Sequence, residues 1–188
     1  MSEQPPQPPP PPPPAPGPAG GQPVPGVPRP GELLDRFLAR LIDGILLGVV
    51  FGIMSAIFSG IFLTGLTYST GEWLLYWLFV SVIYVAIAMG YFAYMESTRG
   101  ATLGKQILKL KVVGPDGANN PTMEQAIRRN AFYAIQLAYI VPIVGAIFGG
   151  LAMLAAVIMI AVTINNDTVA RQGWHDKFAG GTRVLKIG

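Results

Sequence analysis

The sequence predicts an all-α membrane protein, a small transmembrane bundle of four membrane segments with a small cytoplasmic β element. Hydrophobic residues make up 51% of the 188 residues, and charged residues only 12%, about half the charged share of a soluble domain. No lysine or arginine occurs over residues 41–98 or 130–170. Most of the prolines, 15 of 18, lie in the first 30 residues, so the remaining chain can form long helices.

The first stretch without positive charge holds two predicted membrane crossings. Gly44–Leu66 is an apolar run, long enough to span a hydrocarbon core of about 30 Å. Residues 64–71 carry no charge and are followed by the acidic Glu72, and this stretch predicts a loop. Trp73–Tyr94 is the second crossing, and its aromatic residues near both ends suit the two membrane interfaces.

The second stretch allows two interpretations. Ala131–Ile164 is about 51 Å long if fully helical, too long for one upright crossing and short for two. Pro142 and Gly145 favour a break, so we expect segments over 126–140 and 145–164, the first of them short or tilted. The alternative interpretation is that this stretch forms one long crossing, which gives three crossings in total. Short basic loops stay in the cytoplasm, and only an even count puts every basic cluster there, so four crossings are favoured.

The first 31 residues form a proline-rich tail that is predicted to be disordered and cytoplasmic. A run of prolines fills residues 8–14, and such a composition adopts extended polyproline II structure without burying a core. Residues 32–188 are the expected transmembrane domain. The tail is either a flexible leader or a ligand for a proline-binding cytosolic partner. With four crossings, both termini are cytoplasmic and the protein is multi-pass in the plasma (cell) membrane.

The polar connector between the two hydrophobic stretches contains a predicted strand. Residues 109–113 alternate in polarity and run into the turn signal Gly114-Pro115-Asp116-Gly117. Residues 182–187 have a similar pattern, and we expect the two segments to pair, because a lone strand leaves its backbone groups unpaired. Gly104-Lys105 lacks the spacing of a phosphate-binding loop, so nucleotide binding is rejected.

Ionisable residues gather where the first helix enters the membrane. Arg36, Arg40 and Asp43 lie at i, i+4 and i+7, on one stripe. Asp43 is the only acid inside a predicted crossing, and an ionised carboxylate there is costly unless paired, so we expect an arginine counterion. Asp176 lies on the same side and completes the charge cluster with Arg36. His175 is either a proton relay or a hydrogen-bonding surface residue.

Enzyme chemistry is the weakest class of function for this chain. It has no cysteine and one histidine, which excludes thiol nucleophiles and the usual metal sites. We therefore expect no metal, no cofactor and no catalytic residue. Nucleic-acid binding is also not expected, because the basic residues flank membrane segments and lack a stacking platform.

Several motifs resemble those of one family. Residues 36–43, RFLARLID, resemble the opening motif of the RDD family of membrane proteins. Later blocks similar to that family, in the same order within about 32–187, are Thr102–Lys105, Leu110–Val113, Arg129-Asn130 and His175–Thr182. Gly180-Gly181 contains one glycine more than the family usually has. The one Arg and two Asp of the family name map to Arg36, Asp43 and Asp176.

The resemblance implies an integral, mostly bacterial membrane domain, in which transport has been proposed and some members look like cation/proton antiporters. Two functions stay open. One is a transporter that exchanges monovalent cations for protons, as a homo-oligomer. The other is a membrane-embedded adaptor or assembly module whose proline-rich tail recruits cytosolic partners. Arg36, Asp43 and Asp176 are either a transport site or a salt-bridge clasp. The glycine repeat at residues 44, 48 and 52 suggests close helix contact.

Overall fold

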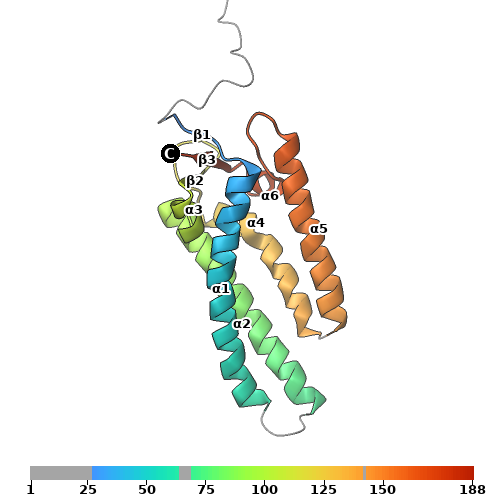
Figure 1. The fold of residues 1–188 in the computed structure, drawn as a ribbon. Helices are drawn as coiled ribbons and strands as arrows, with labels where there is room; N and C mark the ends of the chain where they lie inside the picture. Colours follow the sequence, from blue (N-terminus) through green and yellow to red (C-terminus); the bar gives the residue numbers. More distant parts are fainter. Residues whose placement is uncertain (1–26, 64–68, 142) are drawn as a thin grey trace, which may run out of the picture.

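The computed structural model describes residues 27–63, 69–141 and 143–188. Two antiparallel helical hairpins, α1–α2 and η1–α5, extend from a cap that holds a small sheet and short helices (Figure 1). In chain order the elements are β1 (Arg29–Pro30), α1 (Leu33–Phe62), α2 (Thr70–Arg99), α3 (Leu103–Ile107), β2 (Leu110–Val113), α4 (Met123–Asn130), the 3₁₀ helix η1 (Ala131–Ile140), α5 (Val144–Asn166), α6 (Trp174–Phe178) and β3 (Arg183–Lys186).

Local sequence signals define both ends of α2. At its start, Ser69 Oγ accepts a hydrogen bond from Glu72 N, and the Glu72 carboxylate accepts one from Ser69 N, a reciprocal cap that satisfies two free donors. At its end, Gly100 adopts φ 69° and its N–H donates to Glu96 O, because glycine takes this left-handed conformation without steric cost. Between these ends, α2 packs on α1 through Met54, Tyr76 and Val80.

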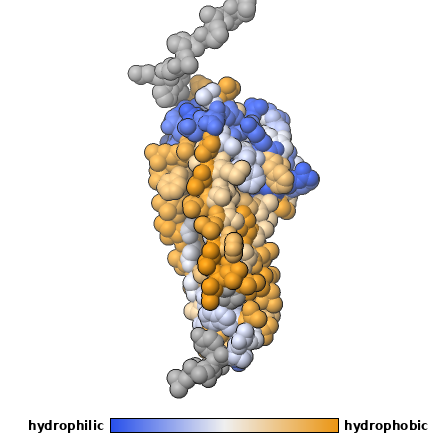
Figure 2. Space-filling model, turned by 90° about the vertical axis from the view of Figure 1, so that its right-hand side faces the viewer, coloured by the Kyte–Doolittle hydropathy of each residue, from blue (hydrophilic) through white to orange (hydrophobic). Residues whose placement is uncertain are grey.

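Among the described residues, three helices, α1, α2 and α5, are long and apolar enough to cross a membrane. Their outward surfaces are apolar, including Ile45 and Ile53 on α1 and Phe148 and Leu151 on α5. Figure 2 shows the same polarity: hydrophilic residues gather at the cap, and hydrophobic residues cover the body below it. A lipid environment accounts for such exposure, which a soluble helix does not show on its solvent face.

The second hairpin is shorter than the first. The ends of η1 and α5 that lie farthest from the cap are closer to it than the corresponding ends of α1 and α2 (Figure 1). The segment predicted over 126–140 begins within α4 and continues as η1, whose ten residues of 3₁₀ helix extend about 20 Å. A Cβ built on Gly145 would lie 1.7 Å from the carbonyl oxygen of Ala138, so only glycine permits this approach. Pro142, the other residue of the predicted break, lies outside the described residues.

The cap contains a three-stranded antiparallel sheet in the order β1-β3-β2. β2 and β3, the two segments paired in the sequence analysis, run in the register Leu110↔Lys186 to Val113↔Arg183. β1 pairs with the other edge of β3 through Arg29↔Lys186. β1 lies within the predicted tail, residues 1–31. The last residues of that tail therefore belong to the folded body.

Candidate functional site

A network of charged side chains is enclosed where the cap meets the helical body. Its carboxyl groups are Asp43, Glu96 and Asp176, each with no exposed surface. Its cations are Arg36, Arg40, Lys105 and Arg129, of which only Arg40 keeps appreciable side-chain exposure, 25%. The elements α1, α2, α3, α4 and α6 each contribute at least one member, so the network joins segments that are far apart in the sequence.

Asp176 is the anion that ties the C-terminal segment to two helices. Its carboxylate accepts hydrogen bonds from Arg36 Nη1 at 3.1 Å and Arg129 Nε at 2.7 Å. The backbone N–H of Gly173, at 3.0 Å, adds a further donor at the start of α6. Burial raises the pKa of Asp176, but the arginine charges outweigh burial and hold that pKa below its usual range. The Arg36–Asp176 contact expected from the sequence is therefore present.

Arg129 is the central cation, and the sequence analysis missed it. It donates to Asp176 and places Nη1 3.3 Å from Glu96 Oε2, so one guanidinium bridges two carboxylates. Its side chain is 2% exposed, whereas its neighbour Arg128 is 55% exposed and pairs with Glu124 on the surface of α4. The two arginines are adjacent in the sequence, and α4 turns only Arg129 inward.

Glu96 is the second residue that sequence reasoning missed. The predicted crossing ends at Tyr94, but α2 continues to Arg99 and buries Glu96 completely. The last turns of α2 thus hold a second buried acid, beyond the predicted crossing. Glu96 accepts hydrogen bonds from Lys105 Nζ and, at 3.1 Å, from Asn130 Nδ2. Burial lowers the pKa of Lys105, and its pairing with Glu96 opposes that shift.

Asp43 has hydrogen-bond donors around it in place of a counterion. It accepts from Tyr91 Oη at 2.8 Å, Thr102 Oγ1 at 2.6 Å and Gly104 N at 2.9 Å. Within the parts of the chain that the structure describes, no Lys, Arg or His nitrogen lies within 4.0 Å of its carboxylate. The predicted arginine counterion of Asp43 is therefore wrong.

Gly104 explains how α3 comes so close to Asp43. A Cβ at this position would lie 2.1 Å from the backbone oxygen of Ala39 and 3.1 Å from Asp43 Cγ. Only glycine lets the start of α3 lie against α1 and aim its N–H at the carboxylate. The Thr102-Leu103-Gly104 block thus binds Asp43, a role that no pattern in the sequence analysis indicated.

Arg40 lies on the predicted stripe with Arg36 but contacts different elements. Its Nη2 donates to Asn130 Oδ1 at 2.7 Å and lies 4.0 Å from Glu96 Oε1. Its guanidinium also lies over the Phe92 ring, 4.0 Å from the centroid, a favourable cation–π geometry. Arg36, Arg40 and Asp43 therefore attach one helix face to three separate partners.

His175 is buried between aromatic rings and the ion network. Its side chain is 6% exposed, and Nε2 lies 3.7 Å from Asp176 Oδ1. Burial lowers its pKa to about 3, although the nearby Asp176 opposes the shift. An imidazole with this pKa is neutral at pH 7. The interpretation as a surface residue is wrong, and the low pKa does not suit a proton relay near neutral pH.

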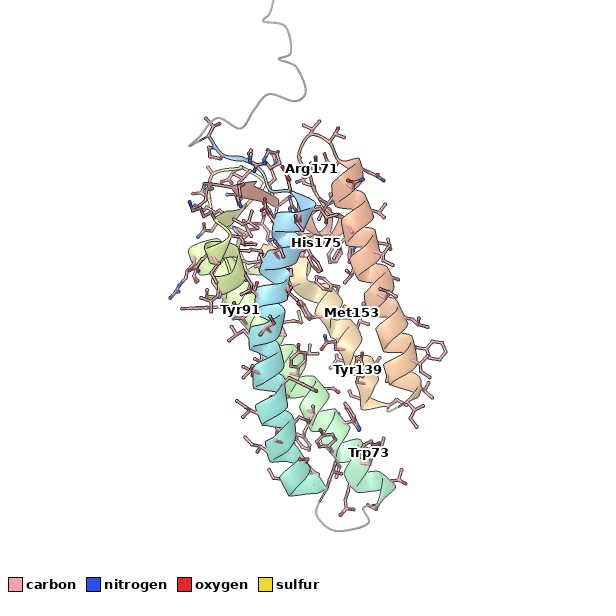
Figure 3. All side chains as sticks on the ribbon, in the orientation of Figure 1. Trp73, Tyr91, Tyr139, Met153, Arg171 and His175 are labelled. Atoms are coloured by element: carbon pink, nitrogen blue, oxygen red, sulfur yellow. The ribbon has the colours of Figure 1, made fainter. Side chains whose placement is uncertain are left out.

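Two adjoining cavities lie below the network. The larger, about 650 Å³, lies between α1, η1 and α5, and Arg36, Arg40, Lys105, Arg129 and His175 line its polar end. The smaller, about 380 Å³, has walls from α1, α2 and η1. Tyr84 on α2 and Gln136 on η1 line both cavities. Figure 3 shows that His175 and Met153 of the larger cavity lie nearer the cap than Tyr139 of the smaller one.

The glycine repeat of α1 forms part of the cavity walls. Gly44 lines the larger cavity and Gly48 the smaller. A Cβ at residue 44, 48 or 52 would meet no atom within 4 Å among the described residues. The predicted close helix contact at these glycines is wrong within the described chain, because the missing side chains leave open space there.

The buried unsatisfied groups coincide with these cavities. Over the described residues, the buried side-chain nitrogens and oxygens without a hydrogen-bond partner are Arg36 Nη2, Arg40 Nη1, Trp77 Nε1, Arg129 Nη1 and His175 Nδ1. All five belong to residues that line one of the two cavities. Unsatisfied buried polar groups are costly, and their position indicates where an acceptor would bind. The same described residues contain no group of three or more His, Asp or Glu side chains that could hold a metal ion.

The long apolar helices and the ionised network under a polar cap define an integral membrane protein with an internal polar site. The model of the RDD family matches residues 30–180, so the chain belongs to the RDD family. No curated protein matches the chain, and no solved structure does. In this RDD protein, Arg36 and Asp176, two of the three residues that the resemblance maps to the family name, bind each other, and Asp43 is bound separately.

Proposed function

We propose that this RDD protein is a four-pass membrane carrier that binds a negatively charged substrate beneath the cap and passes it through the two cavities. The observation that carries the proposal is the larger cavity, whose polar end is lined by four cations and no carboxylate. Positive side chains with free donors select anions, because each can form a charge-assisted hydrogen bond with a substrate oxygen.

The path of the chain supports four crossings. The hairpin α1–α2 leaves the cap and returns to it, and α5 returns to it from the far end of the second hairpin (Figure 1). The segment α4–η1 therefore has to carry the chain away from the cap. Eight residues of α-helix and ten of 3₁₀ helix extend about 32 Å together. β1 pairs with β3, so both ends of the body lie on the cap side, and the basic residues on that side support a cytoplasmic position for it.

The charge balance favours an anion. Glu96 and Lys105 form a neutral pair wherever their proton lies. The remaining charged groups are three arginines and two carboxyl groups, namely Arg36, Arg40, Arg129, Asp43 and Asp176. His175 is neutral, since burial lowers its pKa to about 3. One positive charge is thus in excess even with both carboxyl groups ionised, and an anion would compensate it.

Cation/proton exchange, which the family resemblance implies, has less support from this geometry. A transported cation needs a carboxylate that it can reach. None of the three buried carboxyl groups is among the residues that line the two cavities. Asp43 in particular is enclosed by its three donors.

Transport in proteoliposomes tests the proposal. We would compare anionic and cationic substrates of matched size, including anionic, zwitterionic and cationic lipids with the same fluorescent tail. We expect anionic substrates to move faster, and Gly48→Leu to abolish the movement by filling the smaller cavity. Gly60→Leu is the matched control, since residue 60 lies on the same helix and lines neither cavity. Cation flux coupled to proton counterflow, with no anion movement, would overturn the proposal.

The adaptor function remains a separate prediction. It depends on the proline-rich tail, and residues 1–26 lie outside the described residues. β1 attaches the tail to the cap, so we expect the tail to extend into the same compartment as the charged loops. Deleting residues 1–26 should remove cytosolic partners from a purified complex if the tail recruits them, and should leave transport unchanged.

A further inference from the structure

We infer that the larger cavity takes an anionic phospholipid, which enters sideways from the bilayer between α1 and α5 and places its headgroup among the cationic side chains. The inference rests on the proposed function and names its substrate class.

The mouth of the larger cavity faces the apolar surface of the body. Phe37, Leu41 and Ile45 repeat every four residues along α1, line the cavity and are each about half exposed or more. Val157 on α5 also lines the cavity and is about half exposed. In a bilayer this rim lies against acyl chains, so an amphiphile reaches the cavity without leaving the lipid, whereas a water-soluble ion would cross an apolar rim.

The inner end of the cavity offers donors for a phosphate. Arg36 and His175 are 7% and 5% exposed, and each has a buried nitrogen without a hydrogen-bond partner among the described residues. Arg40 contributes a third such nitrogen. Arg129 lines the same cavity and adds its positive charge, although its guanidinium already pairs with Glu96 and Asp176. Guanidinium groups bind phosphate oxygens with charge-assisted hydrogen bonds, and the single excess positive charge matches a headgroup with one net negative charge.

The size and polarity gradient fit a lipid better than a free anion. A volume of about 650 Å³ is typical of sites for ligands of drug size. It would hold a phosphoglycerol headgroup and the first part of the acyl chains. The wall that α5 contributes is apolar, with Met153, Ile160 and Ala161, so the acyl chains can lie along it and leave through the mouth into the bilayer.

Lipid retention by the purified full-length protein tests the inference without requiring transport. The protein would be exchanged into nanodiscs with equal amounts of phosphatidylglycerol and phosphatidylcholine, released into detergent, and analysed by native mass spectrometry. We expect one retained phosphatidylglycerol per chain. Glycerol phosphate is the probe for a water-soluble headgroup alone, and we expect it neither to bind nor to displace the lipid at comparable concentration.

Two variants separate the cavity from the general surface. Ala161→Trp fills the larger cavity and leaves every charge in place, so retention should be lost. Ala155→Trp adds the same ring at an exposed position of α5 outside the lining, and retention should persist. Arg40→Gln removes the excess charge, and the preference for phosphatidylglycerol should fall by about tenfold, as expected for one charge-assisted hydrogen bond.

Each result supports or overturns the inference. Equal retention of both lipids, retention by Ala161→Trp at the wild-type level, or binding of glycerol phosphate as tight as that of the lipid would overturn it. A lipid that is retained but never crosses the membrane would sustain the inference and defeat the proposed carrier function. Movement of water-soluble anions without lipid retention would sustain the proposed carrier function and overturn the lipid inference.

Discussion

Arg129 Nε lies 2.7 Å from Asp176 Oδ1, and this ion pair joins α4 to α6 inside the cap. The same guanidinium reaches Glu96 on α2, so three elements share one cation. Because the pair is enclosed by protein, removal of Arg129 takes a charged donor away from two buried carboxylates at once. The folded cap should therefore depend on Arg129 more than on any surface arginine.

Replacing Arg129 tests this dependence. We expect Arg129→Gln to destabilise the protein by about 3–5 kcal/mol, the range for a broken buried pair. The neighbouring Arg128→Gln removes only an exposed pair with Glu124, worth about 0–1 kcal/mol. Thermal unfolding of both variants in the same detergent gives the comparison. Equal midpoints would contradict the assignment of Arg129 as the central cation.

Gly104 should tolerate no side chain. The Cβ of Gly104→Ala would lie 2.1 Å from the Ala39 backbone oxygen, so α3 would have to move away from α1 and from Asp43. We expect little folded protein on size-exclusion chromatography. Gly44→Ala is the matched control, because its Cβ meets no atom within 4 Å in the described chain. Alanine also favours a helix over glycine by about 1 kcal/mol, so Gly44→Ala should be as stable as wild type or more so.

Asp43 is predicted to act as a hydrogen-bond acceptor that holds α3 on α1. Asp43→Asn keeps an acceptor for Tyr91 Oη and Gly104 N, and should retain transport and most of the stability. Asp43→Ala leaves three buried donors without a partner, each worth about 1–3 kcal/mol, and should unfold. Thermal unfolding and proteoliposome flux measure the two effects. A stable Asn variant that is inactive would instead assign Asp43 to the transported ion.

Stability should fall with pH below about 6.5 because of His175. Its pKa is lowered to about 3 in the folded state, while the unfolded chain has the ordinary value near 6.5. Between these values the unfolded state binds the extra proton, so acid favours unfolding. The loss should be about 1 kcal/mol from pH 7 to pH 5.5.

His175→Phe removes this titration while retaining a ring between Phe132 and Trp174. Its unfolding midpoint should change less than that of the wild type over pH 4–6.5, a range above the depressed pKa of Asp176. Parallel pH profiles of the two proteins would show that the buried imidazole does not cause the loss.

The long elements could be predicted because their signals are local. The length and polarity of the apolar runs indicate α1, α2 and α5, and alternation indicates the segments that become β2 and β3. The partners of single charged residues depend on packing. Arg128 and Arg129 are alike in sequence, and only the orientation of α4 makes one buried. The position of Asp43 beside an apolar run predicted a buried acid. Its three donors are Tyr91 on α2 and two groups at the start of α3, which comes this close only because residue 104 is glycine.

The end of α2 shows why Glu96 was missed. The apolar run stops near Tyr94, and hydropathy does not reveal that the helix continues into the cap for another turn. The cavities were also beyond prediction, since the glycine repeat of α1 reads equally as a packing surface. Whether the repeat packs or lines a cavity depends on how far η1 and α5 lie from α1.

The most direct test of the account is the ratio of anionic to cationic substrate movement through the same proteoliposomes, for wild type and Arg40→Gln. The account predicts a ratio well above one for wild type and a marked fall in Arg40→Gln, which loses the excess positive charge of the network. A ratio below one that Arg40→Gln leaves unchanged, together with loss of movement in Asp43→Asn, would contradict it.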